Sequence, residues 1–223
     1  MQQQKSKKLI IYIFFLIFLG SINNLNFNET TSKKIININI IGLSEIQNNA
    51  LTIQIEKLNL ENIFFINAKE LDNIFSTNSI IHNYKIFKNY PSTLNVEIQK
   101  TKFLAKINEN GKIYIIGSNG KFLKNNPSIE NLPFIFGKPK IQEFLDLKTK
   151  VDKSKIPYDQ IKNLFFFQSK RWDLQLINNI TIKLSKDNTI ESMNFAYDFL
   201  RNNSLLDYKT IDVRVKNQII VNG

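Results

Sequence analysis

The hydrophobic residues of this chain follow two periods, one typical of strands and one typical of helices. Ile36, Ile38 and Ile40 alternate with asparagine, which predicts a half-buried strand. Ser44 and Gln47 have the spacing of a capping box, which favours a helix soon after that strand. The apolar residues that follow fit a helical period, although some of them also fit a period of two. The capping box decides for the helix.

A second helix and two more strands complete this first pattern. Asn67 and Glu70 form another capping box ahead of a short apolar stripe, which predicts a short helix. Strand-like segments follow at about residues 80–88 and at residues 94–98. The resulting order, β-α-α-β-β, predicts one small α+β domain over residues 34–101.

The remainder, residues 103–223, is dominated by alternating segments and turns. Residues 103–107 and 113–116 flank Asn110-Gly111, which predicts a β-hairpin. A helix beginning near Asp187 carries one apolar face, and we expect this part to be a mainly antiparallel β domain with that helix packed on one face. The residues of the apolar face are Ile190, Met193, Tyr197 and Leu200; a shorter helix is predicted at 141–147, and further strands at 174–176, 180–184, 211–215 and 219–221.

The N-terminus has the pattern of an export signal. Lys5, Lys7 and Lys8 precede an uninterrupted apolar run that begins at Leu9, and a polar stretch follows it. By the positive-inside rule, the basic end stays in the cytoplasm and the rest crosses the membrane. We predict a cytoplasmic tail over residues 1–8 and an anchor over residues 9–27. A cleaved signal peptide stays open as the alternative, because the clean apolar run is shorter than the roughly 20 residues of a spanning helix.

The net charge of +11 is concentrated in the middle of the chain, where residues 100–171 carry 15 basic and 6 acidic side chains. Such a surface attracts nucleic acid, anionic lipid or an acidic protein. Export excludes nucleic acid as the partner. A solvated lysine-rich face is the preferred interpretation, and contact with an anionic membrane or an acidic partner is the alternative.

Candidate catalytic groups are scarce. The chain has no cysteine and a single histidine, His82, so disulfides, thiolate catalysis and cysteine-ligated zinc are excluded. The carboxylates are scattered, and no phosphate-binding loop or nucleophile elbow occurs. The sequence therefore predicts a protein that is not an enzyme and needs no metal or cofactor.

Several short segments resemble, in order and spacing, motifs of the FtsQ/DivIB family of bacterial cell division proteins. The first two are similar to the POTRA module of that family, and the others to its second domain. The family's E-[RY]-x-P-x-A motif appears at residues 99–105 without its proline. The segments are IIGLS (40–44), YPSTLNVEI (90–98), GKFL (120–123), LPFIFG (132–137), RWDLQLINNITIKLS (171–185) and IDVRV (211–215).

This resemblance implies a single-pass type II protein of the inner membrane, with its body in the periplasm and no catalytic activity. Its expected partners are other division proteins at the septum, of the FtsB/FtsL type, bound by strand addition to the last strands. The position of the family's partner-binding arginine is Arg214. Our candidate partner-binding residues are Val213, Arg214, Val215 and Lys216, together with Arg171 and Trp172.

Other interpretations of these residues stay open at this stage. Arg214 also fits an ordinary solvated strand charge, and Trp172 fits packing in the core or at its rim. For the whole chain, the alternatives are a periplasmic POTRA protein that binds or transports polypeptides and, with less support, a secreted hydrolase.

Overall fold

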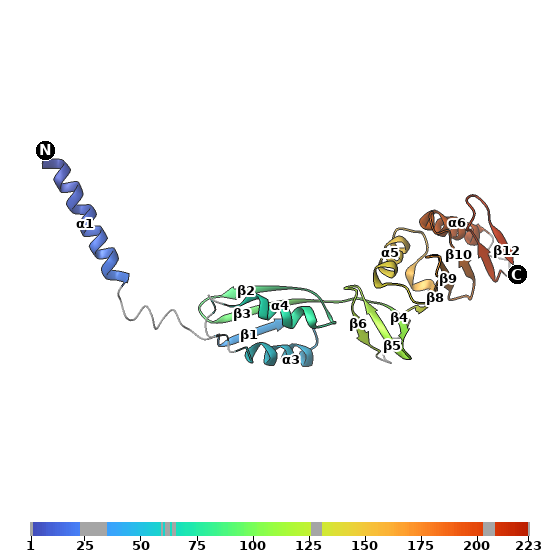
Figure 1. Ribbon diagram of the computed structural model, residues 1–223, viewed down its shortest axis with the longest axis horizontal. Helices are drawn as coiled ribbons and strands as arrows, with labels where there is room; N and C mark the ends of the chain where they lie inside the picture. Colours follow the sequence, from blue (N-terminus) through green and yellow to red (C-terminus); the bar gives the residue numbers. More distant parts are fainter. Residues whose placement is uncertain are drawn as a thin grey trace. The chain divides into compact units, whose positions relative to one another are not determined.

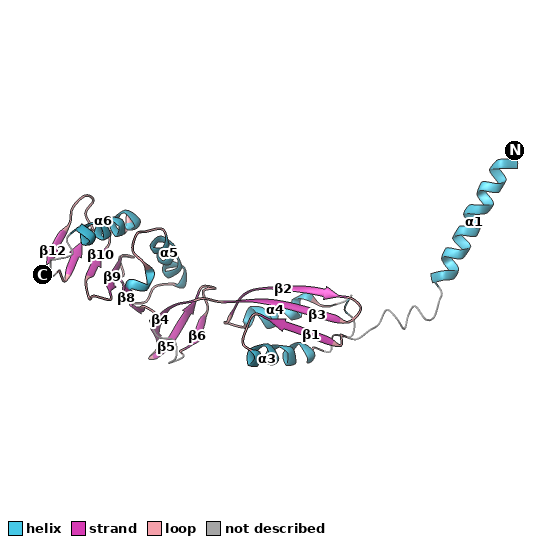
Figure 2. Cartoon of the chain, turned by 180° about the vertical axis from the view of Figure 1, so that it is seen from behind, coloured by secondary structure: helices cyan, strands magenta, loops and turns pink. Residues whose placement is uncertain are grey.

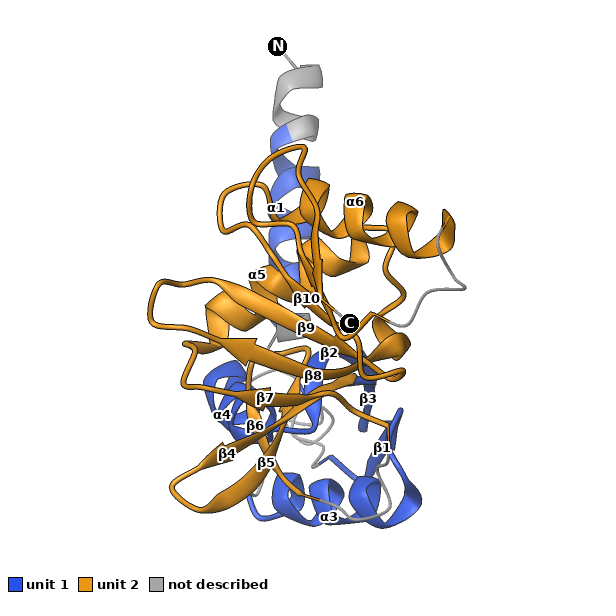
Figure 3. Ribbon diagram, turned by 90° about the vertical axis from the view of Figure 1, so that its right-hand side faces the viewer, with its two compact units in different colours: residues 1–100 blue, residues 101–223 orange. Residues whose placement is uncertain are grey.

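The computed structural model describes residues 2–22, 35–58, 60, 63, 66–125, 131–202 and 208–222. The polar linker expected at residues 28–33 lies outside these ranges. The chain divides into two compact units, residues 1–100 and 101–223, coloured separately in Figure 3. The fold is mixed α+β, with a small N-terminal unit and a larger sheet in the second unit.

The N-terminal apolar run is helical. Helix α1 (Gln2–Ile22) contains the whole run (Figure 1). Every side chain from Leu9 to Leu19 is at least half exposed. Across the described residues, no helix has both the length and the apolar character that crossing a membrane requires. The anchor therefore stays a prediction.

The first unit has the predicted order β-α-α-β-β after α1 (Figures 1 and 2). Its three-stranded sheet has the order β1-β3-β2, with β1 parallel and β2 antiparallel to the central β3. Helices α3 and α4 pack on the face of the sheet that carries the buried side chains of β3. The elements are β1 (Asn37–Ile41), α3 (Glu45–Glu56), α4 (Ala68–Thr77), β2 (Ile81–Asn89) and β3 (Thr93–Lys100).

Both predicted helix starts are present. The backbone N–H of Ser44 donates to Gln47 Oε1 at 3.4 Å, as a capping box requires. At α4, Asn67 Oδ1 accepts the N–H of Lys69 at 3.1 Å, and Asn67 Nδ2 donates to Glu70. The helical period of the first helix is confirmed, because the positions that point inward are a turn apart, at Leu51 and Ile55.

The second unit contains one nine-stranded sheet, in the order β12-β11-β10-β9-β8-β7-β4-β5-β6. Five neighbouring strand pairs are antiparallel and three are parallel. Its strands are β4 (Phe103–Glu109), β5 (Lys112–Gly117), β6 (Phe122–Lys124), β7 (Phe134–Phe136), β8 (Ile161–Phe166), β9 (Trp172–Leu176), β10 (Thr181–Lys183), β11 (Thr210–Asp212) and β12 (Ile220–Asn222). The predicted hairpin is β4–β5, and its turn residues Asn110 and Gly111 both have positive φ angles.

Two helices pack on one face of this sheet, and each connects a parallel strand pair. Helix α5 (Ile141–Asp152) lies between β7 and β8, and α6 (Thr189–Asn202) lies between β10 and β11. Parallel neighbours need such crossovers because a tight turn cannot return the chain to the same end of the sheet. Phe144 of α5 and Met193 of α6 are completely buried against the strands. The predicted single packed helix is α6; α5 is longer than predicted.

Candidate functional site

The last strand of the chain lies at one end of the nine-stranded sheet. Strand β12 pairs with β11 along one side, and it is the terminal member of the strand order. Its side chains are exposed, with Ile220 at 53% and Val221 at 41%. The edge of β12 that faces away from β11 therefore presents backbone N–H and C=O groups that an added strand can pair with.

The connection between β11 and β12 is organised around Asp212. Its carboxylate accepts the backbone N–H of Arg214 at 3.1 Å and the side-chain Nε at 2.8 Å. Arg214 Nη2 also donates to Asp212 Oδ2 at 2.5 Å. The hydrogen bond from the Arg214 side chain is the main cause that lowers the pKa of Asp212. The guanidinium is thus held in one place, while the Arg214 side chain stays 46% exposed.

Arg214 was expected within a strand over residues 211–215, and this boundary is wrong. Strand β11 ends at Asp212 because the Asp212 side chain captures the Arg214 N–H that a longer ladder would use. A turn follows, with the Gln218 N–H bonded to the Val215 carbonyl and Asn217 at a φ of 60°. The final strand begins one residue later than predicted, at Ile220.

A row of alternating charges crosses three strands on the face of the sheet away from α5 and α6. Asp173 on β9 pairs in register with Lys183 on β10, and Lys183 with Asp212 on β11. Arg171 donates to Asp173 through Nε at 3.1 Å, as Arg214 does to Asp212. Burial raises the pKa of Asp173, although the Arg171 guanidinium opposes this shift. The row connects the two predicted arginines through residues that the sequence analysis did not select.

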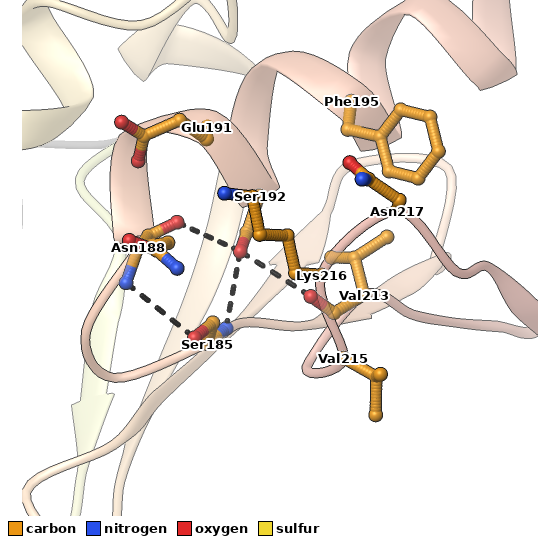
Figure 4. Close-up of a pocket in the computed structure, with 9 residues that line it drawn as sticks. All are labelled: Ser185, Asn188, Glu191, Ser192, Phe195, Val213, Val215, Lys216 and Asn217. Carbon is orange, nitrogen blue, oxygen red and sulfur yellow. Dashed lines mark hydrogen bonds between the residues drawn. The ribbon is translucent and has the colours of Figure 1, made fainter.

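A pocket of about 230 Å³ lies between α6 and the β11–β12 connection (Figure 4). The Ser192 hydroxyl at its base donates to the Asn188 carbonyl at 2.8 Å and approaches the Val213 carbonyl at 3.3 Å. These bonds fix the connection against α6. Exposed Phe195 and Val215 form the apolar part of the wall. The lining residues are Ser185, Asn188, Glu191, Ser192, Phe195, Val213, Val215, Lys216 and Asn217.

The structure brings four of the six candidate residues together. Val213 is buried, while Val215 and Lys216 line the pocket beside Arg214. The other two, Arg171 and Trp172, lie two strands away at the start of β9. The Trp172 ring is 7% exposed and packs on Phe166 at 4.8 Å between ring centroids, as core packing predicts. Their roles in partner binding stay predictions.

Sequence reasoning missed Phe195 and Ser192. At 3.6 residues per turn, Phe195 lies on the side of α6 away from its apolar stripe, so the sequence identifies it as an outward side chain. An aromatic residue on the polar face of an amphipathic helix was the available signal. In the ranges that the structure describes, no three His, Cys, Asp or Glu residues are grouped closely enough to hold a metal ion.

Comparison with known proteins gives consistent results. A family model described as "Cell division protein FtsQ/DivIB, C-terminal" matches residues 105–214. The chain is 23% identical over 202 residues to the cell division protein FtsQ of Rickettsia bellii (strain RML369-C), which covers 88% of this chain and 76% of that protein. It is 22% identical over 219 residues to the cell division protein FtsQ of Rickettsia felis (strain ATCC VR-1525 / URRWXCal2), covering 95% of this chain and 82% of that protein.

Among solved structures, the chain is similar to the major extracytoplasmic domain of the trans isomer of the cell division protein DivIB from Geobacillus stearothermophilus. The TM-score is 0.34 at 9% sequence identity, and the match covers 48% of this chain and 98% of that chain.

Proposed function

Because this chain belongs to the FtsQ/DivIB family of non-enzymatic cell division proteins, we propose that it is a divisome scaffold whose C-terminal sheet edge binds other division proteins. The partners are proteins of the FtsB/FtsL type, assembled at the septum. The observation that supports this mechanism is the position of β12 at the end of the sheet. Family membership sets aside the secreted hydrolase considered from the sequence.

Strand addition to β12 uses the open backbone edge for affinity and the neighbouring side chains for specificity. An added strand lies beside exposed Ile220 and Val221 and next to the pocket wall of Phe195 and Val215. Arg214 contributes a positioned cation, because Asp212 restricts its side chain before the partner arrives. An acidic residue on the partner pairs with the exposed part of this guanidinium.

The proposal includes the location of the molecule. The apolar residues of α1 serve as the retained anchor, Lys5, Lys7 and Lys8 remain in the cytoplasm, and residues 34–223 lie in the periplasm. The first unit acts as a POTRA-like domain that contacts further division components. Its β-α-α-β-β order supports this assignment. The orientation is testable by protease treatment of intact spheroplasts, which removes a C-terminal tag only if the body lies outside the cytoplasm.

The central experiment is co-purification of the full chain with its FtsB and FtsL homologues after co-expression in a bacterial membrane. We expect the wild-type chain to retain both partners. Arg214→Glu reverses the positioned charge and lowers partner recovery by at least about tenfold, as for an interface hot spot. Lys153→Glu makes a similar charge change at an exposed position beyond α5 and serves as the matched control.

Two outcomes separate the parts of this proposal. Full recovery of partners by Arg214→Glu contradicts the role of the β11–β12 connection, while family membership still stands. Failure of the wild-type chain to retain either partner contradicts the scaffold function itself.

A further inference from the structure

A second cavity shares no lining residue with the pocket beside Arg214 and has none from β11 or β12. It has a volume of about 480 Å³, against about 230 Å³ for the pocket beside Arg214. It is formed at the C-terminal end of α6, where Leu200 and Arg201 meet the β9–β10 turn and the segment that precedes β8. We name it the α6 C-terminal cavity. Its volume is in the range of small-molecule sites in proteins, about 300–1,000 Å³.

The α6 C-terminal cavity becomes more apolar with depth. Ile156 and Ile182, at 4% and 0% exposure, are the most buried of its lining side chains. Leu176, Tyr197 and Leu200 are half-buried and form its walls. These five side chains offer branched aliphatic surface and one aromatic ring. Such walls accept a flexible hydrocarbon chain, which gains free energy in proportion to the apolar area it removes from water.

The rim of the cavity is polar and carries one charge. Gln160, Asn178 and Arg201 are exposed there, and among the residues that the structure describes, no acidic residue lines the cavity. Within the described ranges, neither a hydrogen bond nor an ion pair engages the Arg201 guanidinium. The acid one turn earlier on α6, Asp198, is paired with Lys155 at 2.6 Å. The rim therefore favours an anionic group.

From the apolar interior and the cationic rim, we propose that the α6 C-terminal cavity binds an anionic amphiphile, namely a medium-length acyl chain that ends in a carboxylate. The acyl chain lies against Leu176 and Leu200, and the carboxylate pairs with Arg201 at the rim. Exposed Ile177, at the β9–β10 turn, covers the part of the acyl chain that lies nearest to solvent. This site is separate from the β12 edge and does not depend on the proposed partner binding.

The test uses the full chain in lipid nanodiscs and a diazirine analogue of octanoate, which is water-soluble enough to remain largely outside the bilayer. After photolysis, mass spectrometry maps the labelled residues. We expect labels on the peptides that contain Leu176–Ile177 and Tyr197–Leu200. Unlabelled octanoate competes, whereas octyltrimethylammonium, which has the same chain and the opposite charge, competes more weakly.

Two variants make the assignment specific. Arg201→Gln removes the exposed cation and lowers labelling by about threefold, the effect of a single solvent-exposed ion pair. Leu200→Trp fills the cavity and abolishes labelling, with circular dichroism to verify that the variant is folded. Lys153→Gln is the control, and we expect wild-type labelling. If Leu200→Trp does not fold, Arg201→Gln alone still tests whether the ligand carboxylate pairs with Arg201.

Several results would overturn the proposal. Labels confined to α1 or spread over the whole surface mean that the probe partitions without a site. Equal competition by octanoate and octyltrimethylammonium means that the charge of Arg201 plays no part. Competition by an acidic peptide but not by octanoate means that the cavity is a protein-docking site and that the amphiphile assignment is wrong.

Discussion

The Tyr84 hydroxyl on β2 donates a hydrogen bond of 2.5 Å to Asp72 on α4. The same tyrosine ring packs on Phe75 with 4.5 Å between ring centroids. One side chain thus connects the sheet of the first unit to its second helix by both a polar and an aromatic contact. Because the first unit has a small core, a contact of this kind accounts for a measurable part of its stability.

The Tyr84 contact predicts a loss of stability at alkaline pH. The hydrogen bond to Asp72 raises the pKa of Tyr84 from 10.0 to about 12. The protonated hydroxyl therefore stabilises the folded unit fully below pH 10, and this contribution is lost as the pH rises toward 12. Tyr84→Phe removes it at every pH and costs about 1 kcal/mol at neutral pH. Urea unfolding of the wild-type chain and of Tyr84→Phe at pH 8 and pH 11 measures both effects. If the two proteins differ in free energy of unfolding by the same amount at both pH values, the stabilising role of the protonated Tyr84 hydroxyl is contradicted.

The Asp212–Arg214 pair predicts a pH dependence of the opposite sign. The Arg214 hydrogen bonds hold the pKa of Asp212 below its usual value of 3.8. The stabilisation is thus complete above pH 3.8 and is lost as the pH falls through the lowered pKa. Nuclear magnetic resonance titration of the Asp212 carboxyl should give a lower midpoint in the wild-type chain than in Arg214→Gln. Lys216→Gln, two residues further on, is the control and leaves the midpoint unchanged.

Elements with a local signal were predictable from the sequence. The Ser44 cap, the Asn110-Gly111 turn and the apolar stripe of α6 each depend on residues close together in the chain. The order of the strands was not predictable, because pairing depends on which crossovers connect them. Helix α5 was predicted too short, since lysines follow its first two turns and only Leu147 and Val151 continue the buried face.

The candidate site was predicted in part, for a similar reason. The resemblance of residues 211–215 to a known motif selected the segment that leads from β11 into the turn before β12. The alternating pattern of this segment, taken alone, predicted that Arg214 pairs within the strand. Strand β11 ends because the Asp212 side chain, in place of a neighbouring strand, accepts the backbone N–H of Arg214 two residues later. The alternation of apolar and polar residues gives no sign of such a side-chain hydrogen bond. Lys183 and Asp173 were missed because their proximity to Asp212 arises from strand pairing.

The core of the second unit predicts a strong contrast between two phenylalanines. Phe144 of α5 is completely buried, so Phe144→Ala leaves a cavity and should cost about 3–5 kcal/mol. Phe136, on the opposite face of the sheet, is 44% exposed and stacks on Phe165. Phe136→Ala loses mainly this stacking, about 1 kcal/mol. Thermal unfolding of the two variants measures the contrast, and similar losses would contradict the described packing of α5.

The β12 edge predicts unequal effects of proline at two neighbouring positions. Successive N–H groups along a strand point to opposite edges, so of Ile220→Pro and Val221→Pro, one removes an N–H that bonds β11 and the other removes an N–H that faces outward. We expect the variant that removes the N–H bonded to β11 to lower the melting temperature. The variant that removes the outward N–H should keep the wild-type melting temperature and lose co-purification with the division partners, because an added strand needs that N–H. Undiminished partner recovery by the thermally stable variant would show that the partner does not bind by pairing with this edge.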